Sequence, residues 1–181
     1  MKQSEQQVFS GFMNRSYKGP YTATDIIIRY NDGKKDGVIL IERLNEPYGI
    51  AWPGGIGERM PNPRNAVKES REETGLVAIL DEPLRPFLAL SGIDDDPRDF
   101  ISTNVYTAQG SGILMPDPKE DAKRAFLVDH DELYALTQSK NLWAMERHRR
   151  VGVLYLDHIG FEKAKGEAAS IRRKITQEYR L

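Results

Sequence analysis

The sequence predicts an α/β domain, and three observations support this fold class. Short apolar runs of strand length recur before residue 130, beginning with residues 22–30 and 38–41. A glycine-rich loop that starts at Pro53 leads into a short helix, which ends at a glycine. From residue 141 onward, apolar and charged residues follow a helical spacing, which predicts a helical C-terminal part.

The composition fits a soluble protein that binds neither a membrane nor nucleic acid. The chain has 181 residues, 39% of them hydrophobic and 29% charged, and a formal net charge of −1. This size suits one domain, and the nearly neutral charge gives no electrostatic case for nucleic acid. The chain has no cysteine, which excludes disulfides, thiolate metal sites and a cysteine nucleophile. Because no apolar run approaches the roughly 18 residues of a membrane span, we expect a cytoplasmic protein.

We expect one domain over residues 1–181, organised in three parts. Residues 1–20 form a lead-in with limited structure. Residues 20–136 form the core, which holds the predicted strands and the glycine loop. Residues 141–181 form the C-terminal helices.

The first two strands form a predicted hairpin. Residues 26–28 are three consecutive isoleucines, too continuously apolar for a strand with one solvated face. We therefore expect the strand at residues 22–30 to be covered on both faces. The polar segment 31–37 contains two glycines and predicts a hairpin loop, after which the chain returns as a strand at residues 38–41.

Four further strands are predicted after the glycine loop. Residues 77–80 form an apolar run, and residues 100–108 alternate as a strand does. Pro86 interrupts the run at residues 84–90, which suits a strand at a sheet edge. A loop over 109–118 precedes the last strand, at 125–128, and an acidic helix start comes after it.

The helix after the glycine loop has clear start and stop signals. Asn62 is expected to cap its free N–H groups, and Pro63 suits the first helical position. Gly75 suits the left-handed residue just past the end of a helix. The apolar face of this helix is thin and consists mainly of Ala66 and Val67.

Three carboxylates lie close together on this helix. Glu69 and Glu73 share one face, and Glu72 lies beside them. A like-charge pair at that spacing costs roughly 0.2–0.5 kcal/mol. A hard divalent cation would turn this repulsion into binding, because Mg²⁺ accepts carboxylate oxygens. The alternative is an ordinary solvated acidic face.

The glycine loop and the acidic helix together resemble the signature of the Nudix (MutT) hydrolases. Residues 53–55 read Pro-Gly-Gly, and residues 72–76 read Glu-Glu-Thr-Gly-Leu. The signature is degenerate at three positions. Lys68 stands where Arg is usual, Ser70 where an aliphatic residue is usual, and Met60 where an isolated Glu is usual.

This resemblance implies an α/β/α sandwich with a mixed central β-sheet and a C-terminal helical extension. It also implies a Mg²⁺-dependent hydrolase, with Mn²⁺ as an alternative ion, that cleaves the diphosphate of a nucleoside diphosphate linked to another group. The motif at residues 96–98 resembles the ADP-ribose pyrophosphatase-like branch. ADP-ribose or a related nucleotide sugar is therefore the expected small-molecule substrate. A homodimer would also suit the resemblance.

The resemblance also implies roles for individual residues. The metal ligands would be Glu69, Glu73, Glu120 and the backbone carbonyl of Gly54. Glu72, Glu73 and Glu120 would be catalytic. Glu72 would be a third ligand or an acid beside the ligands, and Glu120 a fourth ligand or the general base.

Two arginines are candidates for substrate binding. Arg43 comes directly after the strand pair and would bind the phosphates or line the pocket for the base. The alternative is a surface arginine that pairs with Glu42 or Glu46. Arg98 is a candidate substrate contact, although Asp99 stands where the motif has Gly.

Other residues leave alternatives open. Asp121 competes with Glu120 for the role of base, and Glu58 can replace the missing glutamate at Met60 if the loop shifts. His148 and His158 are ten residues apart, which matches no tight pair of metal ligands. We therefore expect core or surface histidines.

Two other functions compete with the hydrolase. One is a Nudix-fold nucleotide-binding or sensor module with weakened catalysis, which the three departures from the signature favour. The other is an unrelated α/β domain whose acidic helix is only a surface, which predicts neither metal nor nucleotide affinity.

Overall fold

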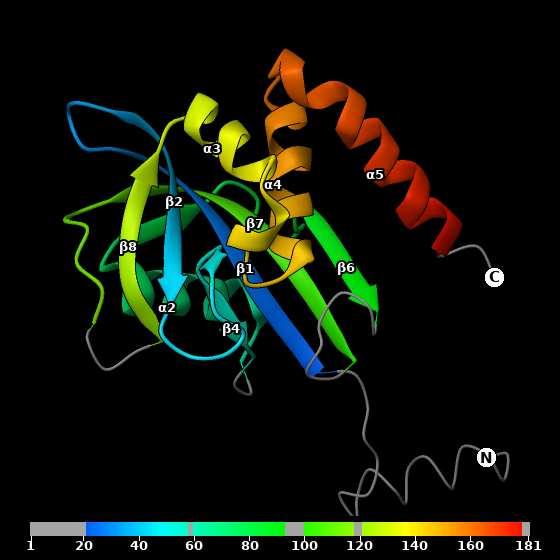
Figure 1. The fold of residues 1–181 in the computed structure, drawn as a ribbon. Coiled ribbons are helices and arrows are strands. Elements are labelled where there is room, and N and C mark those ends of the chain that lie inside the picture. Colours follow the sequence, from blue (N-terminus) through cyan, green and yellow to red (C-terminus); the bar gives the residue numbers. More distant parts are fainter. Residues whose placement is uncertain (1–20, 58–59, 93–99, 118–120, 179–181) are drawn as a thin grey trace, which may run out of the picture.

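A mixed β-sheet lies between helical layers in the computed structural model, which describes residues 21–57, 60–92, 100–117 and 121–178 (Figure 1). Within these residues the sheet has eight strands. The strands are β1 (Tyr21–Asn31), β2 (Asp36–Arg43), β3 (Ile50–Ala51), β4 (Gly54–Ile56), β5 (Val77–Leu80), β6 (Leu88–Gly92), β7 (Ile101–Ser111) and β8 (Ala122–Val128). The α/β/α sandwich with a mixed sheet is confirmed.

Strand β1 lies at the centre of this sheet. It pairs with β7 in parallel and with β2 and β4 antiparallel. The order through the sheet is β3-β2-β1-β7-β5, with β8 on β2 and β6 on β7. The predicted hairpin between β1 and β2 is confirmed. The strand predicted at residues 84–90 instead runs over Leu88–Gly92, so Pro86 precedes it rather than interrupting it. Within the described residues β6 pairs with β7 alone and therefore lies at an edge, as predicted.

Both faces of β1 are buried, as the three isoleucines predict. Ile27 packs in a core with residues of α4, while Ile26 and Ile28 pack with Ala66 of α2 on the opposite face. Successive side chains of a strand point to opposite faces, so one strand supports both layers. The sheet thereby holds α2 and α4 on opposite sides (Figure 1).

Strands β1, β2, β7 and β8 are all longer than the sequence predicts. β7 continues to Ser111, because its last residues pair with β5. β8 begins at Ala122 rather than at residue 125, because it pairs with β2 along that length. Pairing between strands depends on residues distant in the sequence, so local periodicity does not predict these strand ends.

Helix α2 (Asn62–Thr74) begins one residue earlier than expected. Pro61 occupies the cap position and Asn62 is the first helical residue, so the prediction that Asn62 caps the helix is wrong. No side chain caps this helix start. The predicted end is confirmed, because Gly75 is left-handed with φ of 77° and its N–H donates to Arg71 O.

The buried face of α2 is mostly polar. Ala66 is fully buried, while its buried neighbours include Asn65, Ser70 and Thr74. Asn65 donates to Thr24 Oγ1 at 2.8 Å, and Thr74 Oγ1 donates to Ser70 O at 2.5 Å. The side chain of Ser70 donates to Leu76 O at 3.3 Å, a hydrogen bond that the usual aliphatic residue could not make.

The C-terminal part is helical, as predicted. It consists of α3 (His130–Thr137), α4 (Glu146–His158) and α5 (Lys165–Glu178), with short 3₁₀ turns η1 (Lys140–Leu142) and η2 (Glu162–Ala164). Gly160, with φ of 84°, separates α4 from η2. Within the predicted apolar stripe, Leu142 and Ile159 are exposed and so do not belong to it, whereas Met145, Val151, Leu154 and Tyr155 are buried.

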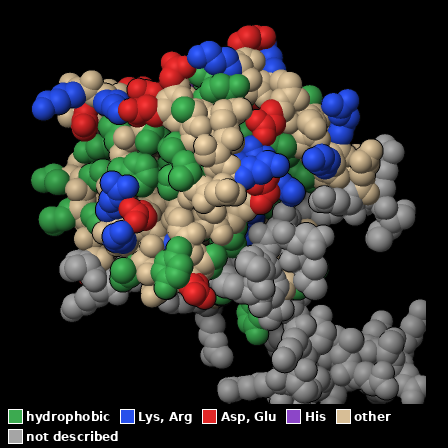
Figure 2. Space-filling view, in the orientation of Figure 1, with side chains coloured by type: hydrophobic (Ala, Val, Ile, Leu, Met, Phe, Trp, Pro, Cys, Tyr) green, Lys and Arg blue, Asp and Glu red, His purple; other side chains and the backbone are tan. Residues whose placement is uncertain are grey.

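The surface is mixed in charge. On the face drawn in Figure 2, positive and negative side chains are interspersed. In the part of the chain that the structure describes, no helix is both long and apolar enough to cross a membrane.

Candidate active site

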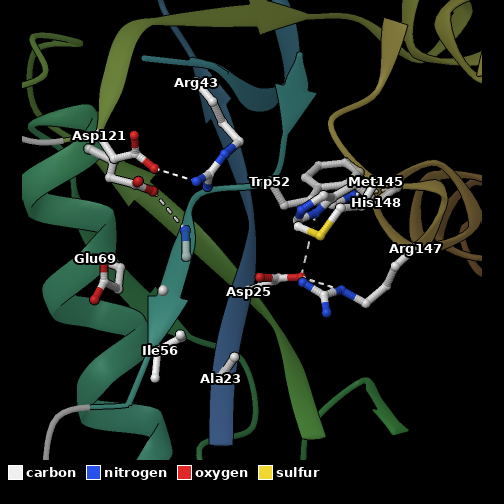
Figure 3. Close-up of a pocket in the computed structure, with 13 residues that line it drawn as sticks. Ala23, Asp25, Arg43, Trp52, Ile56, Glu69, Asp121, Met145, Arg147 and His148 are labelled. Carbon is white, nitrogen blue, oxygen red and sulfur yellow. Dashed lines mark hydrogen bonds and ion pairs between the residues drawn. The ribbon is translucent and has the colours of Figure 1, made fainter. Parts of the chain in front are cut away.

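A pocket of about 240 Å³ opens between α2, the strands β1 and β4, and the start of α4 (Figure 3). Glu69 and Glu73 of α2 line one side of it, and we call these two residues the carboxylate wall. The glycine loop runs beside them, with Gly54 and Gly55 also lining the pocket. Of the residues that the sequence singled out, Arg43, Gly54, Glu69 and Glu73 are thus brought together in one pocket.

Glycine is required where the loop passes the carboxylate wall. The backbone N–H of Gly54 donates to Glu73 Oε2 at 2.7 Å. A Cβ atom on Gly54 would lie 2.2 Å from Thr24 O, and one on Gly55 would lie 2.8 Å from Glu69 Oε1. The two glycines therefore allow the backbone to approach both strand β1 and helix α2.

Glu73 is a strongly perturbed carboxyl group, only 3% exposed. Burial raises its pKa to about 8, the Gly54 hydrogen bond opposes this rise, and the charge of Glu69 adds to it. The two carboxylates supply the oxygen donors that a hard divalent cation accepts. Among the described residues, no three His, Asp or Glu side chains form a complete metal site. The carboxylate oxygens of Glu69 and Glu73 are therefore the right kind of ligand for such an ion. Within the described residues these two side chains are the carboxylates of the wall.

Glu72 lies outside the lining of this pocket. Its Oε2 accepts a hydrogen bond from Lys68 Nζ at 2.7 Å, four residues earlier on the same helix. Lys68, which stands where the signature has Arg, thus still binds Glu72. Lys68 Nζ also lies 3.9 Å from Glu69 Oε1, so its positive charge is close to the carboxylate wall.

Arg43 also lines the pocket, at the end of β2. Its Nη2 lies 2.6 Å from Asp121 Oδ2, and its Nε donates to Pro47 O at 2.9 Å. The alternative of a surface pair with Glu42 is wrong, because the Arg43 side chain is only 10% exposed and Glu42 binds Lys123 instead. Its contact with Glu46 is through that residue's backbone carbonyl.

Three sequence candidates lie outside the described residues: Glu58, Arg98 and Glu120. Asp121, the alternative to Glu120, is described and lines the pocket. Its Oδ1 accepts hydrogen bonds from the backbone and side chain of Asn45, at 3.0 and 2.8 Å. Asp121 is therefore a firmly held carboxylate that faces the carboxylate wall and is paired with Arg43.

The opposite side of the pocket was missed by sequence reasoning. It is formed by Asp25 of β1 with Arg147 and His148 of α4, which we call the charge-paired wall. All three residues are 3% exposed or less. His148 is a buried histidine, as the sequence predicts, and His158 is exposed. The sequence carried one signal for Asp25, because this acid directly precedes the three isoleucines of a strand predicted to be covered on both faces. An acid at such a position is expected to be buried and to need a partner.

The fold is that of the Nudix/MutT proteins. The chain is 23% identical to a MutT/nudix family protein from Enterococcus faecalis over 70% of this chain and 56% of that one, with a TM-score of 0.51. It is 16% identical to a NUDIX hydrolase from Nitrosomonas europaea over 80% and 75%, with a TM-score of 0.62. No protein-family model and no curated protein matches the chain.

A third similar structure is a bifunctional NMN adenylyltransferase/ADP ribose pyrophosphatase from Francisella tularensis, complexed with AMP and a manganese ion. The identity is 17% over 84% of this chain and 46% of that one, with a TM-score of 0.61. The chain thus spans about half the length of two of these proteins. At these identities the likeness establishes the fold, in agreement with the resemblance in the sequence.

Proposed function

We propose that this protein is a divalent-metal-dependent Nudix hydrolase that cleaves the diphosphate of a nucleoside diphosphate linked to another group. ADP-ribose or a related nucleotide sugar is the proposed substrate class, with Mg²⁺ or Mn²⁺ as the ion. Water would add to one phosphorus atom, and the bridging oxygen would leave with the other phosphate. The products of ADP-ribose would be AMP and ribose 5-phosphate.

One observation carries this proposal. Glu69 and Glu73 of α2 meet the glycine loop and the Arg43–Asp121 pair in a single pocket. Cleaving a phosphoanhydride requires that negative charge be neutralised and that a water molecule be activated. A bound divalent ion supplies both effects, and carboxylate oxygens are the ligands that hold it.

The residues of α2 and of the glycine loop each have a defined role in this proposal. Glu69 and Glu73 hold the ion, with the backbone carbonyl of Gly54 as a further ligand. The N–H of Gly54 fixes the orientation of Glu73, because it donates to Oε2. Glu72, oriented by Lys68, serves as an acid beside the ligands or as a third ligand.

The remaining roles concern the substrate and the base. Arg43 binds phosphate oxygens of the substrate. Before the substrate binds, the pairing with Asp121 holds the Arg43 guanidinium in the pocket. Glu120 stays the proposed fourth ligand or general base, and Asp121 is the alternative. Arg98 stays a proposed substrate contact.

One of the similar structures supports the substrate class, and another supports the reaction class. The Francisella tularensis protein is described as an ADP ribose pyrophosphatase and was solved with AMP and a manganese ion. The Nitrosomonas europaea protein is described as a NUDIX hydrolase. Those activities belong to those proteins, and this chain shares their fold.

The test is an assay of the protein with ADP-ribose and Mg²⁺, with Mn²⁺ in parallel, that measures AMP and ribose 5-phosphate. We expect product from the wild type and its near absence with Glu73→Gln. Glu82→Gln is the matched control, because Glu82 is exposed and lies away from the pocket. Activity that Glu73→Gln leaves unchanged would remove the carboxylate wall from the proposal.

A second candidate function is a nucleotide-binding sensor with weakened turnover. The observation that favours it is the set of three residues that depart from the signature, Met60, Lys68 and Ser70. Calorimetry with ADP-ribose separates the two functions. Tight binding without product under any divalent ion would support the sensor, and turnover would exclude it.

A further inference from the structure

The C-terminal helix α4 is fastened to the glycine loop. Trp52 Nε1 donates to His148 O at 2.9 Å, and the bond is buried. The N–H of Ala144, just before α4, donates to Ile50 O at 2.9 Å. The start of α4 is thereby fixed to residues 50–52, immediately before the two glycines that line the pocket.

Asp25 connects α4 with this loop from the other side. Its Oδ2 lies 3.5 Å from His148 Nδ1 and 3.7 Å from Arg147 Nε. Arg147 carries the charge opposite to that of Asp25, and the two interact strongly at this depth because little water screens them. Both side chains from α4 therefore act on the same oxygen of Asp25 (Figure 3).

The other side of Asp25 lies against Gly54. The two residues are direct cross-strand partners between β1 and β4. A Cβ atom on Gly54 would lie only 2.7 Å from Asp25 Oδ1, so carboxylate and loop backbone are in close contact. The N–H of Gly54 in turn donates to Glu73 Oε2. A continuous chain of contacts thus runs from Arg147 through Asp25 and Gly54 to Glu73.

We infer that Asp25, held by Arg147 and His148, is a positioning residue that sets the place of Gly54 and, through it, of the Glu73 carboxylate. This inference rests on the proposed function, in which Glu73 is a metal ligand. It gives the C-terminal helix α4 an indirect part in metal binding, through Asp25 and Gly54. Residues that orient metal ligands without touching the ion typically change affinity by about 10–100-fold when replaced.

The position of the Asp25 side chain depends on Arg147. With Arg147 in place, the carboxylate of Asp25 is drawn toward α4 and leaves room for Gly54. Without that guanidinium, a buried charge loses a counter-charge and the side chain relaxes to a new position. Because Gly54 lies in close contact with Asp25, a moved Asp25 side chain would displace the Gly54 backbone. The hydrogen bond from Gly54 N–H to Glu73 would then shift as well.

The test compares two arginines of α4 that are equally buried but face different ways. Arg147 is 2% exposed and contacts Asp25, while Arg149 is 5% exposed and binds Glu146 and Glu167 instead. Arg147→Met and Arg149→Met each remove a buried guanidinium. Mn²⁺ and Mg²⁺ affinity by calorimetry, unfolding temperature without metal, and KM and kcat for ADP-ribose are measured for both.

We expect both variants to unfold at a lower temperature, and only Arg147→Met to bind the ions about tenfold or more weakly. Arg147→Lys, which keeps a positive charge, should recover part of the affinity. If Arg147→Met does not fold, Arg147→Lys against Arg149→Lys makes the same comparison.

Equal ion affinity in the two variants would overturn the inference and leave the proposed function standing. An equal loss of affinity in both would also overturn it, because a general loss of stability would then explain the effect. A wild-type protein that binds no divalent ion would overturn the proposed function, and this inference with it.

Discussion

The two walls of the pocket hold their charges in opposite ways. On the carboxylate wall, like charges lie together, and burial with the charge of Glu69 raises the pKa of Glu73 to about 8. On the charge-paired wall, Asp25 faces Arg147 and His148 across 3.5 to 3.7 Å. The first wall gains from an added cation, whereas on the second wall the guanidinium of Arg147 already compensates the charge of Asp25. One wall is thus suited to binding and the other to keeping the pocket in shape.

The largest expected effect separates activity from stability on the carboxylate wall. Glu69→Gln removes an oxygen donor of the proposed metal site, so we expect kcat/KM for ADP-ribose to fall by about a hundredfold or more. With a pKa of about 8, Glu73 is mostly protonated near neutral pH, so Glu69→Gln relieves little repulsion and should change the free energy of unfolding of the metal-free protein by less than about 0.5 kcal/mol. Glu162→Gln, at an exposed residue far along the chain, is the control. A large loss of stability with Glu69→Gln would contradict the contrast between the walls.

The next effect tests how closely the two walls approach each other at Gly54. Gly54→Ala places a Cβ atom 2.2 Å from Thr24 O and 2.8 Å from Asp25 Cα, which are both backbone atoms. We expect the free energy of unfolding to fall by about 3 kcal/mol, at the upper end for overpacking. Chemical denaturation measures it.

Gly166→Ala is the matched control for this substitution. Gly166 lies in α5 and its added Cβ would meet nothing within 4 Å. Alanine favours the helix over glycine, so stability should rise by up to about 1 kcal/mol. Equal effects of the two substitutions would mean that the loop can move away from β1.

A smaller, pH-dependent effect is expected on the outer side of α4. Burial raises the pKa of Glu146, but the hydrogen bonds from Arg149 outweigh it and the net pKa is lowered. A lowered carboxyl pKa stabilises the fold above the unfolded pKa and loses that contribution as the pH falls through the folded value.

Arg149→Met should therefore cost about 2 kcal/mol near neutral pH, as loss of hydrogen bonds to charged groups does. The difference from the wild type should shrink as the pH falls below the ordinary Glu value of 4.5. Unfolding curves from pH 7 to pH 3 measure this. A difference that stays constant over that range would show that packing, rather than the charge of Glu146, explains the cost.

The smallest effect concerns Lys68, which stands where the resembled signature has Arg. Arg at this position can bind Glu72 through two parallel hydrogen bonds, whereas the ammonium is a point charge. We expect Lys68→Arg to raise kcat a few-fold and to change the free energy of unfolding by less than about 0.5 kcal/mol. Steady-state kinetics measure the first quantity. A fall in kcat would show that the present Lys68–Glu72 pair is already the better arrangement.

Local sequence patterns predicted one wall of the pocket. The glycine loop, the acidic helix and Gly75 are consecutive in the chain, and helical periodicity alone places Glu69 and Glu73 on one face. The two-sided burial of β1 also results from three consecutive apolar residues. The helix start was less predictable, because Asn62 has the side chain of a capping residue but is itself the first helical residue, after Pro61.

By itself, the sequence determined the fold class, the carboxylate wall and the helical nature of the C-terminal part, since each depends on residues close together in the chain. Only the tertiary structure decided that Arg43 pairs with Asp121 and that Arg147 and His148 meet Asp25. These partners are far apart in sequence, and their meeting depends on how α4 packs on the sheet. Periodicity records which face of a helix is buried, but it does not record which buried charge on another element that face will meet.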